Sequence, residues 1–222
     1  MAGKVVAIDP GHNGANESHP EIINQMIDGG YGQRHVCNTT GTQTDAGYPE
    51  HEFAWNVATY LRPMLEAKGI TVVMTRSNDS SVGPCTDKRA AIENNADADA
   101  VVSIHGDGAP SDVEGFYVLT ATRPPAGATI AAASLRLASC IAAGVKGVGF
   151  PPSNTLGSGG LWKRDDLTGL NRSTRPKILI ECGNMRNPTE AGLMSSDSGQ
   201  RRYAQGLADG VFEFLRGGGS AS

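Results

Sequence analysis

Three short apolar runs in this sequence lead, within a few residues, to a histidine or a glutamate. The runs and the residues that follow them are 5–8 with His12, 100–104 with His105, and 178–180 with Glu181. Short apolar runs bounded by turn residues are typical of buried β-strands. Ligands of open α/β sheets bind beyond the carboxyl ends of the strands, so the pattern predicts one site that contains all three side chains.

Segments with helical periodicity alternate with these runs. Residues 50–68, 86–95, 128–145 and 198–215 are expected to be helices, and residues 70–75 and 115–119 to be further strands. Strands that alternate with helices indicate an α/β fold. We therefore expect a single twisted, mostly parallel mixed sheet of about five or six strands, with helices on both faces. Pro63 should kink the first of these helices, and Thr86 should cap the second.

The organisation of the chain is simple. Its 222 residues suffice for one domain with a full hydrophobic core. We find no internal repeat and no linker, and we expect one domain over residues 1–216 followed by a flexible tail over 217–222. Residues 13–49 are polar and rich in glycine, asparagine and threonine. They are expected to form a long loop, and loops of this length are usually functional or mobile.

Composition argues against several partners. The net charge is -4 and the sequence has no basic block, which argues against nucleic acid or an anionic membrane as the main partner. No apolar run approaches the ~20 residues that span a bilayer, so no membrane span is expected, and we expect a monomer. The N-terminus lacks the apolar core of a signal peptide, so an exported protein would have lost its signal from this chain.

The four cysteines allow three fully paired connectivities. Cys37 lies in a polar stretch and Cys85 follows a Gly-Pro pair. These two loop cysteines could form one disulfide, which would indicate an oxidising compartment. Four free thiols in a reducing cytosol are the alternative. Cys140 and Cys182 lie in apolar segments and are expected to be buried.

Two histidines and one carboxylate are a known catalytic zinc set that leaves one position open for water. Glu50 stands where the long polar segment meets the first helix, which could bring it to the same edge as His12 and His105. A carboxylate that does not bind the metal, such as Glu181, could then take a proton from water. Spacing alone leaves open that these side chains cap or pack, and it argues only for metal-assisted hydrolysis.

Other polar and aromatic residues have plainer interpretations beside functional ones. Asp9 could either orient His12 or cap the loop that follows. Trp55 and Trp162 could stack on sugars, although large aromatic side chains more often belong to the core or to a groove wall. Residues 164–166 are expected to form a solvated charged turn. The histidines expected to lie in solvent are His19, His35 and His51.

Residues 6–14, with the sequence VAIDPGHNG, resemble the opening motif of the zinc N-acetylmuramoyl-L-alanine amidases of the amidase-3 family. The resemblance continues, in order, through residues 69–76, 89–95, 98–105 and 178–187. It therefore covers nearly the whole chain. Residues 48–51 and 83–85 look most like the short single-domain mycobacterial members.

This resemblance implies roles for four residues. In the family a histidine, a glutamate and a second histidine bind zinc, and a late glutamate is catalytic; by motif these are His12, Glu50, His105 and Glu181. Glu50 is preferred to Glu52 because it precedes a basic residue and, nineteen positions on, a glycine, as is usual in the family. The chain departs from the family at residues 106–107 and at Cys182, and neither departure removes a proposed ligand or base.

The implied activity is zinc-dependent hydrolysis of the amide bond between N-acetylmuramic acid and the L-alanine of the peptidoglycan stem peptide. It would serve cell-wall remodelling, cell separation or lysis. Peptidoglycan or its muropeptide fragments would be the substrate, met after export to the periplasm, cell wall or exterior. The alternatives are a zinc peptidase that cleaves another peptidoglycan amide bond, and a non-catalytic peptidoglycan-binding module. Retention of Glu181 argues against the last, because a pure binder needs no base.

Overall fold

A computed structural model describes residues 1–217 of the chain. The strands of its central sheet are β1 (Val5–Pro10), β4 (Thr71–Met74), β5 (Ala100–Asp107), β6 (Tyr117–Ala121), β7 (Leu161–Arg164) and β8 (Lys177–Asn184). Their order across the sheet is β4-β1-β5-β8-β6-β7. The strand-end residues of β1, β5 and β8 therefore lie on adjacent strands.

The sheet is mostly parallel. β1 pairs in parallel with β4 and β5, and β5 pairs in parallel with β8. β6 pairs antiparallel with β8 and parallel with β7, which is the edge strand. The central strands read as unbroken apolar runs because both of their faces are buried. The expected fold class, a single mostly parallel mixed sheet of five or six strands, is confirmed.

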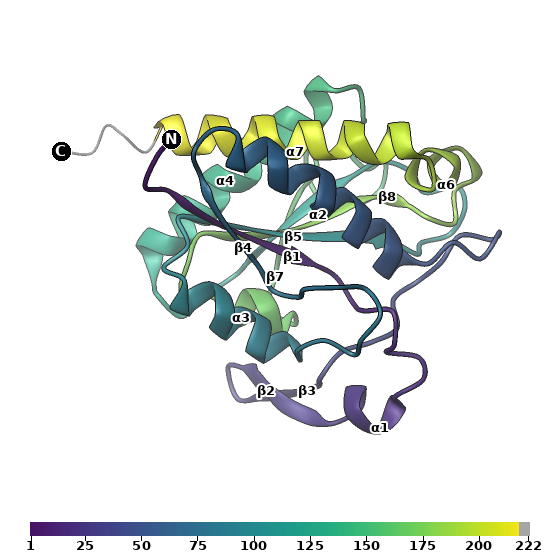
Figure 1. Ribbon diagram of the computed structural model, residues 1–222, viewed down its shortest axis with the longest axis horizontal. Helices are drawn as coiled ribbons and strands as arrows, with labels where there is room; N and C mark the ends of the chain where they lie inside the picture. Colours follow the sequence, from purple (N-terminus) through teal and green to yellow (C-terminus); the bar gives the residue numbers. More distant parts are fainter. Residues whose placement is uncertain (218–222) are drawn as a thin grey trace.

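Helices cover both faces of this sheet (Figure 1). One face carries α2 (Glu50–Glu66), α4 (Ala128–Gly147), α6 (Pro188–Met194) and α7 (Asp197–Gly217). The other face carries α3 (Thr86–Asn95) and α5 (Thr168–Asn171). Beyond α3 lie α1 (Pro20–Ile23) and a hairpin of β2 (Met26–Gly30) and β3 (Gln33–Val36).

The long helices are held by apolar stripes at helical spacing. Tyr203, Leu207, Val211 and Phe214 are buried along one side of α7, as the sequence period predicts. α7 packs against both α4 and α2, and α2 in turn lies on β1 and β5. The first residue of α2, Glu50, is thereby placed over the carboxyl ends of these two strands.

The expected cap at Thr86 is wrong, whereas the expected kink at Pro63 stays a prediction. α2 continues unbroken through Pro63. Pro63 has no N–H for the carbonyl of Thr59, but Thr59 is exposed, so water can replace the missing donor. Thr86 is not a cap but the first residue of α3, and Cys85 at the cap position makes no side-chain hydrogen bond. The N–H of Thr86 donates instead to the carbonyl of Cys37 at 2.9 Å.

The long polar segment is more structured than the sequence indicates, because α1 and the β2–β3 hairpin both lie within residues 13–49. A disulfide joins Cys37, just after β3, to Cys85, just before α3. This confirms the expected pairing. Cys182 is buried and free, as expected, whereas Cys140 is free but only half-buried, because it lies on the partly exposed side of α4.

The last helix runs into the predicted tail, and one of the long helices, α4, is strongly apolar. α7 extends to Gly217, the first residue of the predicted tail, and residues 218–222 lie outside the described part. In the described part, α4 alone is long and apolar enough to cross a membrane by length and composition. That is weak evidence, because the core helix of a soluble protein passes the same test. Arg136 and Lys146 interrupt its apolar run, and Leu137, Ile141 and Val145 are buried in the core.

Candidate metal centre

His12 follows the carboxyl end of β1 in a left-handed backbone conformation, with φ of 55°. Such a φ is uncommon for a residue that has a side chain. The Nδ1–H of His12 donates to the carbonyl of Thr39 at 3.0 Å, which leaves Nε2 to face Glu50, 3.1 Å from Oε1. A backbone carbonyl thus fixes the ring orientation and leaves one nitrogen for a ligand role.

Glu50 is buried at the start of α2. Its Oε1 lies between two imidazoles, 3.1 Å from Nε2 of His12 and 2.8 Å from Nδ1 of His105. The backbone N–H groups of Thr42 and Gly106 also donate to the carboxylate, at 2.9 and 3.2 Å. A buried carboxylate needs partners of this kind, and here they hold it in a single position.

His105 lies in β5, where the register with β8 shifts. Its ring stands edge-on to that of His12, with centroids 5.0 Å apart. Glycines press on the site from two sides. A Cβ at Gly11 would lie 2.3 Å from Cε1 of His105, and one at Gly41, which has φ of 80°, would lie 2.6 Å from Oε2 of Glu50. Only glycine lets the backbone approach this closely.

The donor atoms of His12, Glu50 and His105 all lie within 4.8 Å of one another. Two imidazoles and one carboxylate are the donor set of a catalytic zinc site, and they suit a borderline metal. Glu52, the alternative carboxylate, is exposed on α2. The structure therefore brings together the three residues that the motif names, and they fit a zinc ion.

Glu181 lies in β8, beside His105 in the parallel register and beside Tyr117 in the antiparallel one. It lines the same cavity as the three donors, with a volume of about 350 Å³. Its Oε2 is buried without a hydrogen-bond partner within residues 1–217. Burial raises the pKa of Glu181 well above its usual value, and the carboxylates of Glu50 and Asp107 raise it further. A carboxyl group in this setting is suited to proton transfer.

The three donors influence one another's ionisation. Burial lowers the pKa of His12, but the Glu50 carboxylate and the carbonyl of Thr39 together outweigh it, so the net shift is upward. Burial raises the pKa of Glu50, but the two imidazoles outweigh it, and the pKa falls. At His105 burial prevails and the pKa is lowered. The lowered pKa of His105 favours the neutral imidazole that metal binding needs, whereas the raised pKa of His12 favours its protonated form in the absence of a metal.

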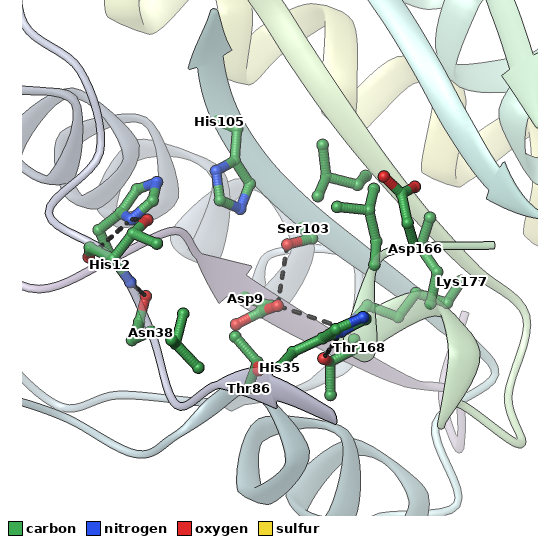
Figure 2. A pocket seen from close by; sticks show the side chains of 16 residues that line it. Asp9, His12, His35, Asn38, Thr86, Ser103, His105, Asp166, Thr168 and Lys177 are labelled. Carbon is green, nitrogen blue, oxygen red and sulfur yellow. Dashed lines mark hydrogen bonds and ion pairs between the residues drawn. The ribbon is translucent and has the colours of Figure 1, made fainter. Parts of the chain in front are cut away.

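A second cavity, of about 400 Å³, adjoins the donors, and both His12 and His105 help to line it (Figure 2). Asp9 lies in its wall but neither orients His12 nor caps the loop, so both expectations for Asp9 are wrong. The partners of its carboxylate are Thr75, Ser103, Arg89 and Lys177. A buried carboxylate is drawn to buried cations and hydroxyls, which here lie beneath the ends of the strands.

The two tryptophans contact protein side chains. The Arg76 guanidinium lies over Trp55 at 5.0 Å. Trp162 packs against Tyr117, with the ring centroids 6.1 Å apart. The guanidinium of Arg164 also lies over the Trp162 ring, 4.8 Å from its centroid. The expected solvated turn is corrected in part, because Arg164 belongs to β7 and forms an ion pair with Asp166.

The remaining histidines are less exposed than the sequence indicates. Nδ1 of His51 donates to the carboxylate of Asp79 at 2.7 Å, and Nδ1 of His35 lies 2.8 Å from the hydroxyl of Thr168. Both are half-buried, as is His19. Asp79 and Thr168 are distant in sequence from the histidines that they contact, so local composition gave no sign of them.

Sequence reasoning gave no role to two buried arginines beside the site. Arg76 lies two residues after the end of β4, and Arg89 lies in α3; both donate to the backbone around His12. The available signal was an arginine at the end of an apolar strand, because arginine is rarely buried without partners. Asp107 and Tyr117 were also missed; the tyrosine hydroxyl donates to that carboxylate at 2.9 Å.

Two histidines at the ends of parallel strands and a buried glutamate at the start of a helix surround one cavity with Glu181, whose Oε2 has no hydrogen-bond partner in the described residues. This arrangement resembles that of a metal-dependent hydrolase. Comparison with known proteins specifies the class. The family model Amidase_3, described as N-acetylmuramoyl-L-alanine amidase, matches residues 6–213. The chain belongs to this family of enzymes, as its motifs indicate.

The chain is similar to mycobacterial members of the family. It is 42% identical to the N-acetylmuramoyl-L-alanine amidase Rv3717 of Mycobacterium tuberculosis, over 100% of this chain and 90% of that protein. The crystal structure of the amidase Ami1 from Mycobacterium abscessus matches with a TM-score of 0.92 and 43% identity, covering 97% of this chain and 100% of that one. Ami1 from Mycobacterium smegmatis matches with a TM-score of 0.92 and 40% identity, covering 98% and 99%. The expected resemblance to short mycobacterial amidases is confirmed.

Proposed function

We propose that this protein hydrolyses the amide bond between N-acetylmuramic acid and the L-alanine of peptidoglycan, using zinc held by His12, Glu50 and His105. Glu181 is the catalytic base. The observation that carries the proposal is the position of Glu181. Its Oε2 has no hydrogen-bond partner in the part of the chain that the structure describes, and the residue lines the same cavity as three donors within 4.8 Å of one another. Family membership supports the choice of bond.

The chain supplies a charged, oriented donor set. Zinc, when bound, supplies a Lewis acid that polarises a carbonyl oxygen and lowers the pKa of water. Glu50 contributes the negative charge that favours a cation between the two imidazoles. The carbonyl of Thr39 holds Nδ1 of His12, which fixes the tautomer and keeps Nε2 directed to the site.

Glu181 moves the proton. It accepts a proton from the attacking water and passes it to the amine that leaves with L-alanine. Burial, and then the carboxylates of Glu50 and Asp107, raise the pKa of Glu181, which strengthens its affinity for the proton that it takes from water. The hydroxyl of Tyr117 donates to Asp107 and keeps this carboxylate in place.

Export and substrate form part of the same proposal. The Cys37–Cys85 disulfide supports action in an oxidising compartment outside the cytosol. Peptidoglycan or its muropeptide fragments are the substrate class, as the names of the relatives suggest. The catalytic domain spans residues 1–216 and acts as a monomer; elution at the size of one 23.1 kDa chain would support this state.

Glu181→Gln tests the proposal, with Glu52→Gln on the exposed side of α2 as its control. Glutamine keeps the shape of the side chain but cannot take up the proton. We expect Glu181→Gln to retain about one zinc per chain and to lose ~10²–10⁴-fold in rate. Glu52→Gln should keep both. Metal analysis and mass spectrometry of digested muropeptides are made on the same samples.

The possible results separate the competing functions. Products that carry a free L-alanine amine identify the proposed bond, whereas cleavage within the peptide would indicate a peptidase. Binding of muropeptides without any product in the zinc-loaded wild type would indicate a non-catalytic module. Loss of zinc in Glu181→Gln would make Glu181 a ligand, and an unchanged rate would remove its role as base.

A further inference from the structure

Two buried guanidinium groups hold the backbone around His12. The carbonyl oxygens of three consecutive residues, Pro10, Gly11 and His12, all accept hydrogen bonds from Arg76 or Arg89. Neither arginine is among the clustered donor residues. A side chain that fixes the backbone of a ligand determines where that ligand sits, even though it does not touch the metal.

Arg89 holds the ligand residue itself. Its Nη2 donates to the carbonyl of His12 at 2.6 Å, and its Nη1 donates to that of Pro10 at 2.5 Å. Its Nε donates to the carbonyl of Pro84 at 3.0 Å. Arg89 is only 2% exposed, and Asp9 balances its charge at 3.1 Å. All three nitrogens are therefore in use, and the orientation of the guanidinium is fixed.

Arg76 connects two parts of the donor set. Its Nη2 donates to the carbonyl of Gly11 at 3.2 Å and to the carbonyl of His51 at 2.8 Å. Gly11 precedes His12, and His51 follows Glu50. One nitrogen atom thus joins the loop after β1 to the first turn of α2. Lysine cannot reproduce this arrangement, because it lacks the planar fork of donors.

The Arg76 guanidinium is itself immobilised. Its Nη1 donates to Asp79 at 2.7 Å and to the side-chain oxygen of Asn13 at 3.2 Å, while Trp55 lies against its face. Asp79 also accepts a hydrogen bond from Nδ1 of His51 at 2.7 Å. Asp79 therefore aligns Arg76 with the start of α2.

We propose that Arg76 and Arg89 are positioning residues that fix the separation of His12 and Glu50 and thereby raise the affinity of the centre for its metal. This inference rests on the proposed metal site. His12 has a left-handed backbone, which persists only where the surroundings enforce it. The contacts to three successive carbonyls enforce it here, so that His12 is oriented before a metal arrives.

The competing explanation is that these arginines only stabilise the fold. Arg175 offers a matched control, because its guanidinium also donates to two consecutive carbonyls, those of Asp97 and Ala98, at 2.9 and 2.6 Å. These residues precede β5, at the opposite end of that strand from His105. Arg175→Lys removes the same type of contact and leaves the loop around His12 intact.

Zinc dissociation constants, measured by competition with a chromophoric chelator, test the inference in the wild type, Arg76→Lys, Arg89→Lys and Arg175→Lys. We expect ~10–100-fold weaker zinc binding in the first two variants, the usual effect of losing contacts that orient ligands. Arg175→Lys should bind zinc as tightly as the wild type does, even if its melting temperature falls as far as those of Arg76→Lys and Arg89→Lys. The visible spectrum of the Co²⁺-loaded protein should change in Arg76→Lys and Arg89→Lys only.

Equal zinc affinity in all four proteins would overturn the inference, as would an equal loss in Arg175→Lys. Failure of the wild type to bind zinc would instead refute the proposed function, so the two failures are distinguishable. If the arginine variants do not fold, Asp79→Asn tests the role of Arg76, with Asp28→Asn, at a surface ion pair with Arg172, as its control. Asp79→Asn should weaken zinc binding several-fold, and an affinity equal to that of Asp28→Asn would overturn the role of Arg76.

Discussion

The ionisation of Glu93 should make the stability of this protein fall as the pH rises through neutrality. Glu93 is 0% exposed, and Nζ of Lys177 donates to both of its carboxyl oxygens, at 2.7 and 2.9 Å. Burial raises the pKa of Glu93 to about 8, although Lys177 lowers it. The variant Glu93→Gln tests this prediction. Glutamine keeps the size of the side chain and an acceptor for Lys177, but it cannot titrate.

The sign follows from the two pKa values. In the unfolded chain Glu93 loses its proton near its ordinary pKa of 4.5, whereas the folded protein keeps the proton until about pH 8. Between these values the folded state binds more protons, so the contribution to stability is complete below the unfolded pKa and is lost as the pH rises through the folded one. One pH unit corresponds to about 1.4 kcal/mol, so this group should remove about 3 kcal/mol between pH 5 and pH 7.

Urea unfolding at pH 5, 6 and 7 measures the effect. A chelator is present throughout, so that metal binding adds nothing to the slope. The free energy of unfolding of the wild type, relative to Glu93→Gln, should fall by about 3 kcal/mol from pH 5 to pH 7. Glu66→Gln, which alters an exposed carboxylate paired with Arg62, should follow the wild type. Parallel pH profiles for the wild type and Glu93→Gln would refute the assignment of a raised pKa.

Two further predictions concern the donor set and the disulfide. Glu50→Ala should lose zinc and amidase activity, whereas Glu52→Ala should keep both, because Glu50 contacts two imidazoles and Glu52 is exposed. Metal analysis of both variants measures the difference. Loss of zinc in Glu52→Ala but not in Glu50→Ala would show that the wrong carboxylate was chosen. Cys37→Ser should lower the free energy of unfolding by about 4 kcal/mol, the chain-entropy value for a sequence separation of 48 residues. Urea unfolding of Cys37→Ser measures this loss, with Cys140→Ser, which alters a free cysteine, as the control. A non-reducing peptide map that shows Cys37 and Cys85 as free thiols would contradict the pairing.

The strand-end rule explains why much of the candidate site could be predicted from the sequence. β1, β5 and β8 are neighbours in the sheet, so the short apolar runs before His12, His105 and Glu181 were enough to bring these residues to one edge. The helical period also places Glu50 and Glu52 on different faces of α2. Glu50 lies on the buried face of α2 with Phe53, whereas Glu52 lies in solvent.

The polar segment could not be predicted in this way, because distant contacts hold it. The side-chain amide of Asn171 donates to the carbonyl of Gly29 at 3.0 Å, and Nδ1 of His35 lies 2.8 Å from the hydroxyl of Thr168. Such contacts leave no periodic pattern in the local sequence. Asp9 shows the same limit, since its charged partners come from α3 and β8, far along the chain.

The central place of β8 in the sheet constrains how far this protein can fold while it is being synthesised. β8 lies between β5 and β6, yet it begins at Lys177, after every other described strand has been made. Until it arrives, β5 keeps an unpaired edge and the β6–β7 pair has no neighbour to join, and open strand edges are templates for pairing with other chains. Pairing between segments far apart in sequence is also slow. A growing chain thus carries its three proposed metal ligands long before it carries Glu181, and becomes a complete hydrolase only when its last strand enters the middle of the sheet.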